Sequence, residues 1–186
     1  MGQPLFHIGI LLVFGGHLVG MLVPQSVTER LGISDQMFHA SAIITGSTAG
    51  FITLAGIFIL LIRRVSVKRI RKTSSFADIF IAVLILIVVG LGFFNTFGFN
   101  LFAKSSFNYR ATIAPWIRGV LALTPDPNLM KNVPLSFRLH LILAFTIFGV
   151  WPFTRLVHVW SIPLEYLRRS YILYRDNGLP GKLTKY

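Results

Sequence analysis

Four stretches of the chain are apolar over the length that a bilayer requires. They cover residues 5–23, 39–62, 76–97 and 137–161. A hydrocarbon layer about 30 Å thick is crossed by about 20 residues of α-helix. The pattern therefore predicts an all-α integral membrane protein with four transmembrane helices, forming a single membrane domain over residues 1–186.

Basic residues gather in two of the segments outside these stretches. The segment "RRVSVKRIRK", residues 63–72, holds six cations and no acid, and residues 162–186 form a second basic segment. Lys and Arg are retained on the cytoplasmic side of membrane proteins. We therefore expect a multi-pass protein of a prokaryotic plasma membrane with a cytoplasmic tail, 162–186, both termini inside, and an outer loop at 98–136.

Composition supports the membrane class and excludes several kinds of chemistry. Hydrophobic residues make up 54% of the 186 residues and charged residues only 13%. Cysteine is absent, which excludes disulfides, thiolate metal sites and iron–sulfur ligation by this chain. The net charge is +12, but its cations border the spans, so we expect contact with lipid head groups or a partner and no nucleic acid.

The outer loop contains an amphipathic stretch, "NYRATIAPWIRGVLAL". Its apolar residues Ile113, Trp116, Ile117 and Val120 lie near one face of a helix that can rest in the membrane interface. Such a helix either shields the bundle or roofs a pocket for a lipophilic substrate. The sequence leaves both interpretations open.

All five histidines lie within or at the edge of the apolar stretches: His7, His17, His39, His140 and His158. Ionisable residues in spans are costly and usually face the bundle interior. His7 and His17 are about 15 Å apart along one helix, and His140 and His158 about 27 Å apart on one face of another. Antiparallel helices would pair His17 with His140 near the outer surface and His7 with His158 near the inner surface.

Two such pairs are what two bis-histidine b haems in a stack require. The two separations differ by about 12 Å, and helix tilt and a kink at Pro152 must absorb the difference. Glycines beside His17 would give a flat macrocycle close access, or form an ordinary helix-packing motif. Arg138 and Arg155 precede the two later histidines and either bind haem propionates or extend to the head groups.

Two other interpretations of the histidines remain. Each imidazole can be a neutral packing group hydrogen-bonded to a neighbouring helix, in a membrane anchor without cofactor. Zinc also binds histidine pairs, but a structural site needs four ligands, and no carboxylate is near these histidines in the sequence.

The histidine-bearing blocks "LFHIGILLVFGGHLVGML" and "FRLHLILAFTIFGVWPFTRLVHVWSIPLEYLRRSY" closely resemble the gamma, cytochrome b subunit of membrane-bound respiratory nitrate reductases and of nitrite oxidoreductase-like complexes. The segment "RKTSSFADIF" fits as well, whereas the outer loops fit poorly. The resemblance implies a dihaem quinol-oxidising subunit that anchors an iron–sulfur beta subunit and a molybdenum-containing alpha subunit, with the catalytic molybdenum on another chain.

The resemblance also implies roles for individual residues. In the family, the residues at the positions of His17 and His140 ligate the outer haem, and those at the positions of His7 and His158 ligate the inner haem. Quinol is oxidised beside the outer haem. A basic residue often stands near a haem propionate at the position of Arg64. The family's usual first helix has no counterpart in this sequence. A basic residue implicated in quinol binding is also missing, and His39 is the candidate that replaces it, or else it caps a helix start.

Related proteins leave the direction and the partner open. Similar assemblies reduce nitrate with quinol electrons or oxidise nitrite in reverse. Similar dihaem subunits also serve heterodisulfide-reductase-like or sulfite-reduction-associated complexes, although "RLVHVWSIPLEYL" favours the nitrate reductase side.

Overall fold

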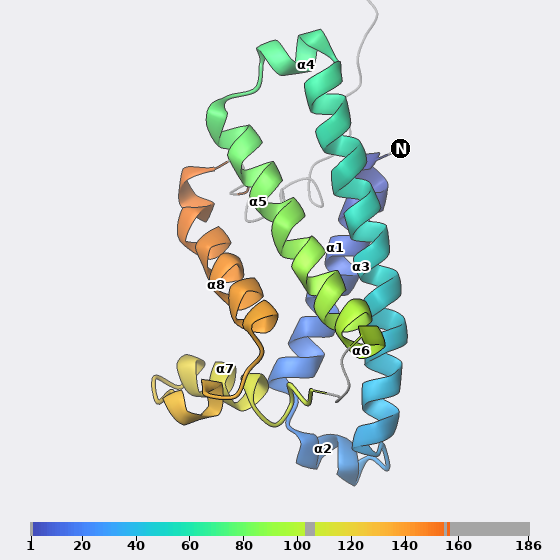
Figure 1. Cartoon of the computed structure of the whole chain (residues 1–186), viewed down its shortest axis with the longest axis vertical. Helices are drawn as coiled ribbons and strands as arrows, with labels where there is room; N and C mark the ends of the chain where they lie inside the picture. Colours follow the sequence, from blue (N-terminus) through green and yellow to red (C-terminus); the bar gives the residue numbers. More distant parts are fainter. Residues whose placement is uncertain (1, 103–106, 155, 157–186) are drawn as a thin grey trace, which may run out of the picture.

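The computed structural model describes residues 2–102, 107–154 and 156, and these residues form a bundle of helices without a β-strand among them (Figure 1). Four helices are long and apolar enough to cross a membrane, which confirms the predicted all-α membrane fold. They are formed by α1 (Gly2–Leu22), α3 (Asp35–Ser66), α5 (Phe76–Phe93) and α8 (Leu135–Val150), of which α5 spans together with the segment up to Gly98 and α8 together with the turn up to Phe153. His158, Arg155 and the tail 162–186 lie outside the described residues.

Shorter elements join the four long helices. They are α2 (Gln25–Arg30), α4 (Lys68–Lys72), a π-helical segment that prolongs α5 (Phe94–Gly98), α6 (Phe99–Phe102), α7 (Ile113–Leu121) and two 3-10 turns (Pro127–Met130 and Trp151–Phe153).

Two long helices differ in extent from the predicted spans. Helix α3 begins at Asp35, because the Ser34 hydroxyl accepts a hydrogen bond from the Met37 amide at 3.3 Å and so caps the helix start. Helix α8 ends at Val150, before the residue expected for a helix over 137–161. Pro152 has no amide hydrogen and restricts the residue before it, so the chain passes into a 3-10 turn there.

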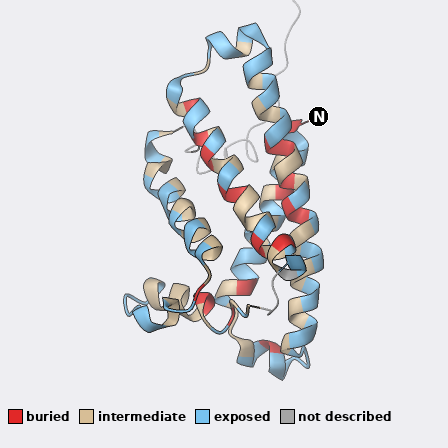
Figure 2. Cartoon of the chain, viewed as in Figure 1, coloured by how far each residue is buried: buried red, intermediate tan, exposed pale blue. Residues whose placement is uncertain are grey.

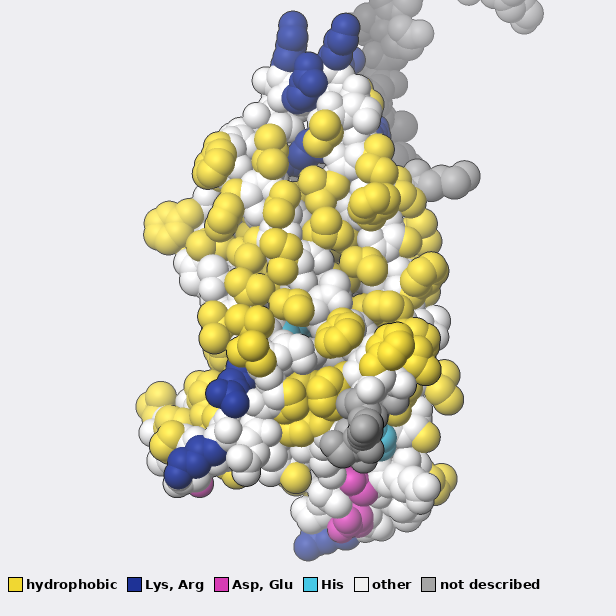
Figure 3. Space-filling view, in the orientation of Figure 1, with side chains coloured by type: hydrophobic (Ala, Val, Ile, Leu, Met, Phe, Trp, Pro, Cys, Tyr) yellow, Lys and Arg dark blue, Asp and Glu magenta, His cyan; other side chains and the backbone are white. Residues whose placement is uncertain are grey.

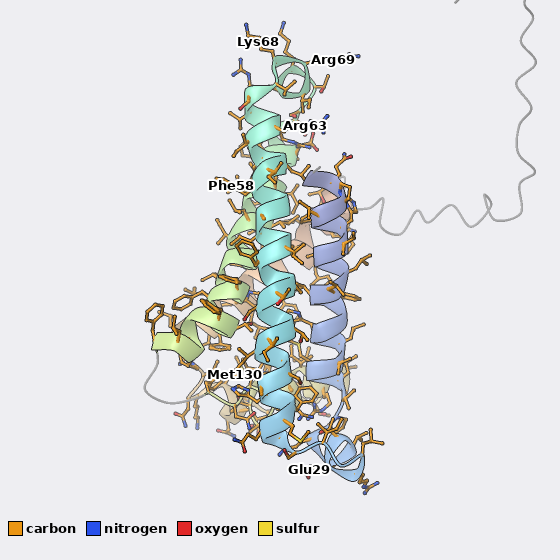
Figure 4. The ribbon with its side chains drawn as sticks, turned by 90° about the vertical axis from the view of Figure 1, so that its right-hand side faces the viewer. Glu29, Phe58, Arg63, Lys68, Arg69 and Met130 are labelled. Carbon is orange, nitrogen blue, oxygen red and sulfur yellow. The ribbon has the colours of Figure 1, made fainter. Side chains whose placement is uncertain are left out.

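Helices α1 and α3 run antiparallel and pack backbone against backbone (Figure 4). A Cβ atom added to Gly9 would lie 2.5 Å from Thr53 Oγ1, and one added to Gly56 would lie 2.5 Å from the Phe6 amide nitrogen. Thr53 is fully buried at this crossing. Small residues therefore let these two helices approach as closely as membrane helices do.

Helix α5 packs against both α3 and α8. Its buried residues Ile81, Leu84 and Val88 pack against Leu143 and Ile147 of α8. Many other apolar residues of the long helices are exposed (Figure 2), as in a bundle whose solvent is lipid.

The two ends of the bundle differ in charge. At the α4 end, Lys and Arg side chains project from the surface, whereas hydrophobic side chains cover the middle (Figure 3). Arg63, Lys68 and Arg69 lie at this end and Glu29 at the other (Figure 4). The opposite end, formed by α2 and α7, carries the exit of α1 and the start of α8 (Figure 1).

Candidate functional site

Two of the predicted site residues come together between α1 and α8. The ring centres of His17 and His140 are 6.1 Å apart, and the ring planes differ by 23°. These residues are 123 positions apart in the chain (140 − 17), so the contact is made by the fold and not by local sequence. The structure thus places side by side the two histidines that were predicted to form the outer pair.

Hydrogen bonds hold one nitrogen of each ring. Nδ1 of His17 lies 2.7 Å from the Val13 carbonyl oxygen, and Nδ1 of His140 lies 3.0 Å from the Val88 carbonyl oxygen of α5. A carbonyl oxygen only accepts, so in each bond Nδ1 carries the proton and donates it. Nε2 of a neutral ring then keeps its lone pair, which is the arrangement found in imidazoles that ligate a metal.

His7 has the same local geometry ten residues before His17 on α1. Its Nδ1 donates to the Gln3 carbonyl oxygen at 2.8 Å, which again leaves Nε2 as the lone-pair nitrogen. His7 lies toward the α4 end of α1, about 15 Å along the helix from His17. Its expected partner, His158, is outside the described residues.

The outer pair fits a metal bound between two imidazoles. Two imidazoles that would each place a nitrogen about 2 Å from one metal have ring centres at most about 6 Å apart, and the separation observed for His17 and His140 meets that limit. A Cβ atom added to Gly15 or Gly16, beside His17, would meet no atom within 4 Å. Within the described residues, no three His, Asp or Glu side chains gather around one point, so the geometry suits two-ligand haem better than tetrahedral zinc.

Helix α7 spans the end of the bundle on the side of this pair. Arg118 donates from Nη1 to the Met21 carbonyl oxygen at 2.7 Å, which satisfies a carbonyl at the end of α1. Trp116 meets Phe145 of α8 edge to face, with ring centres 6.3 Å apart. The amphipathic segment therefore bridges α1 and α8 and covers the end of the bundle where the two imidazoles lie.

A buried polar cluster around Arg110 anchors the outer loop. The guanidinium donates to Asp35 Oδ1 at 3.2 Å and to Thr28 Oγ1 at 3.0 Å, and it lies 3.8 Å from the centre of the Phe38 ring. The side chain is only 3% exposed. Sequence reasoning missed this cluster. The available signal was one arginine beside a strongly apolar stretch, at Asn108–Tyr109–Arg110.

Tyr109 lies beside the Arg110 cluster. Its hydroxyl would lie 2.9 Å from a Cβ atom at Gly20 of α1, so the ring rests on that glycine. Burial raises the pKa of the Tyr109 phenol above its ordinary value, Arg110 opposes this shift, and Asp35 adds to it. The phenol therefore remains neutral and can donate a hydrogen bond at physiological pH.

His39 lies beyond the pair, toward the α2 end. Contacts of Gly2 with Ile59 and of Gly9 with Thr53 set the antiparallel register, in which residue 39 is level with a point about 9 Å past His17. Nε2 of His39 is buried and has no hydrogen-bond partner among the described residues. A buried nitrogen of this kind can accept a hydrogen bond from a hydroxyl group of a ligand.

The structure also assigns contacts to two of the predicted arginines. Arg64 pairs with the buried Asp78 at the start of α5, with 4.0 Å between Nη1 and Oδ2. Arg138 donates from Nε to the Val133 carbonyl oxygen at 2.7 Å and from Nη2 to the Lys131 carbonyl oxygen at 3.3 Å. These bonds tie Arg138 to the loop before α8, so they favour a structural task over a propionate contact.

Comparison with known proteins gives consistent matches over almost the whole chain. The family described as "Nitrate reductase gamma subunit" matches residues 1–177. The nitrate reductase gamma chain of Bacillus subtilis (strain 168) is 48% identical over 95% of this chain and 78% of its own length. The respiratory nitrate reductase 1 gamma chain of Escherichia coli (strain K12) is 37% identical over 94% and 77%. The nitrate reductase-like protein NarX of Mycobacterium tuberculosis (strain ATCC 25618 / H37Rv) is 38% identical over 95% of this chain, which spans about a quarter (27%) of that protein.

Proposed function

The chain belongs to the nitrate reductase gamma subunit family, and from this premise we propose that it is a dihaem cytochrome b that exchanges electrons between a membrane quinol and cytoplasmic partner subunits. The family places the chain in the membrane part of an oxidoreductase complex that has other subunits. The observation that carries the haem proposal is the 6.1 Å juxtaposition of His17 and His140.

We assign His17 and His140 to the outer haem and His7 and His158 to the inner haem. A b-type haem held by these imidazoles supplies reversible one-electron transfer. The chain's task is to fix the ligands. The carbonyl oxygens of Val13 and Val88 hold the Nδ1 protons of the outer pair and orient the Nε2 lone pairs, and a bond of this kind makes the ligating nitrogen more basic.

The quinol is oxidised at the α2 end of the bundle in this proposal. His39 has a buried Nε2 without a partner among the described residues, about 9 Å past the level of His17. That nitrogen accepts a hydrogen bond from a quinol hydroxyl and takes its proton, in the role of a general base. Helix α7 covers this end, which favours lateral access from the lipid for a lipophilic substrate.

The partner subunits bind at the α4 end. Six cations between Arg63 and Lys72 stand there, and the positive-inside rule assigns this end to the cytoplasm. The expected partners are an iron–sulfur beta subunit and a molybdenum-containing alpha subunit, and anionic lipid also suits this surface. Arg64 is held toward α5 by Asp78, where we propose that it borders an inner haem propionate. Direction, towards nitrate reduction or nitrite oxidation, is set by the partner.

The test is the haem content of the purified complex. Wild-type protein should show a reducible b-type spectrum with about two haems per chain. His17→Ala and His140→Ala should each remove one haem, and His158→Ala should remove the other and leave an outer haem that quinol reduces but that passes no electrons on. His39→Ala is the matched control, because it removes an imidazole from α3 without removing a proposed ligand.

Two outcomes would overturn the proposal. A colourless wild-type preparation would return the chain to the class of anchors without cofactor. Full haem content in both His17→Ala and His140→Ala would show that the observed pair is a packing contact. Co-purification of the beta and alpha subunits with the wild type would identify the complex and its terminal substrate.

A further inference from the structure

Helix α5 contains no histidine, yet one of its faces packs against α8 and reaches the ring of His140. Residues Ile81, Leu84 and Val88 pack against α8, and Asn95 donates from Nδ2 to the Ser136 carbonyl oxygen at 3.3 Å. Residues 81, 84, 88, 92 and 95 recur every three or four positions and therefore share one helix face. This face is apolar toward the α4 end and carries the Val88 carbonyl, a glycine and an amide where it reaches His140.

Two positions on this face contact the His140 ring. The Val88 carbonyl oxygen accepts the Nδ1 proton at 3.0 Å. One turn further, a Cβ atom added to Gly92 would lie 2.9 Å from Cε1, 3.5 Å from Nδ1 and 3.7 Å from Nε2 of the ring. Carbon atoms in contact are normally about 3.5–4 Å apart, so the ring occupies space that any side chain at position 92 would fill.

We propose that Gly92 and the Val88 carbonyl of α5 are positioning groups for His140. The carbonyl fixes the tautomer and the rotation of the ring, and the glycine fixes how closely the ring approaches α5. The inference rests on the proposed function, in which His140 ligates the outer haem. Gly92 acts through His140, so a change at position 92 should alter the ligand bond without removing the ligand.

Gly90 provides a matched control. It lies in the interior of the same helix, but a Cβ atom at Gly90 would meet no atom within 4 Å. Gly92→Ala and Gly90→Ala therefore raise the helix propensity equally and differ in what the new methyl group touches. The methyl group at position 92 must displace the imidazole by about half an ångström or more, because the α5 backbone cannot yield as easily as a side-chain ring.

The experiment compares the two variants in the complete complex. A six-coordinate haem excludes carbon monoxide, so a loosened ligand is detected by carbon monoxide binding to the reduced protein. We expect Gly92→Ala to bind carbon monoxide at the outer haem several-fold more than wild type and to shift the midpoint potential of that haem. Gly90→Ala should match wild type in both measurements. Gly92→Val, with two more carbons against the ring, should lower the haem content from about two to about one per chain.

A second measurement needs no substitution at Gly92. Electron–nuclear double resonance on the oxidised wild type should detect an Nδ1 proton on the ligand from α8 that exchanges slowly with deuterium oxide, because the Val88 carbonyl holds it. Rapid exchange of this proton would overturn the part assigned to Val88.

The outcomes separate this inference from the proposed function. If Gly92→Ala and Gly90→Ala both retain the wild-type potential and the wild-type resistance to carbon monoxide, the positioning role of Gly92 is wrong, whereas the haem assignment stands. If wild type contains no haem, or if His140→Ala retains about two haems per chain, the proposed function itself fails.

Discussion

Replacing Arg110 by methionine should release the outer loop from α2 and α3. Methionine keeps most of the apolar stem but removes the bonds to Asp35 and Thr28 and the contact with the Phe38 ring. A hydrogen bond to a charged group contributes about 1.5–3 kcal/mol, and a cation–π contact about 0.5–2 kcal/mol. The bond to Asp35 contributes toward the low end, because the Asp35 side chain is 32% exposed and solvent screens the pair.

We therefore expect Arg110→Met to cost about 3 kcal/mol of local stability, which raises the population of the opened loop about a hundredfold. Hydrogen–deuterium exchange of peptides covering 24–38 and 107–113 measures this opening directly. Arg30→Met is the control, because Arg30 is an exposed cation on α2 outside the cluster. A double-mutant cycle with Asp35→Asn should give a coupling of about 1 kcal/mol.

Two results would refute this reasoning. Exchange in Arg110→Met that matched Arg30→Met would show that the buried guanidinium does not hold the loop. Additive effects of Arg110→Met and Asp35→Asn would show that the 3.2 Å ion pair contributes nothing of its own.

Two further predictions concern the bundle and the proposed quinol site. Gly9→Ala should lower the thermal midpoint of the complex, because its methyl group would lie 2.7 Å from the backbone nitrogen of Thr53 and such overpacking costs about 1–3 kcal/mol. Gly149→Ala, whose methyl group meets nothing within 4 Å, should leave the midpoint unchanged. Equal midpoints for both variants would contradict the close α1–α3 crossing. His39→Ala should retain full haem content and turn over quinol more slowly in a steady-state assay, and unchanged turnover would return His39 to the role of a helix-start residue.

Much of the fold was predictable from the sequence because the bilayer sets helix length and leaves apolar runs little choice of structure. The pairing of His17 with His140 was predictable as well, because antiparallel helices with histidines at matched depth bring these residues to one level. The ends of helices were less predictable. Helix α3 extends through polar residues at both ends, where capping by Ser34 and the helix propensity of Arg63 and Arg64 matter more than hydrophobicity.

The support of the site could not be predicted in the same way. The Val88 carbonyl is a backbone group that every residue type possesses, so no sequence pattern marks it. Gly92 resembles Gly90 in the sequence, and only the position of α8 distinguishes the glycine that touches an imidazole from the one that touches nothing. The π-helical segment Phe94–Gly98 likewise has no signal in the apolar pattern, since it depends on backbone hydrogen bonds and not on side-chain periodicity.

The length of α3 has an electrical consequence. Its 32 residues extend over about 48 Å, whereas the hydrocarbon layer is about 30 Å thick. Since Arg63 and Arg64 mark the boundary at one end, most of the surplus lies at the other, and His39 stands within about 6 Å of that end. If His39 takes a proton from quinol, as proposed, that proton reaches water over a short distance and crosses almost none of the membrane voltage. Under the proposed assignment, nearly all the work against that voltage falls on the electrons that pass from the level of His17 and His140 to the α4 end.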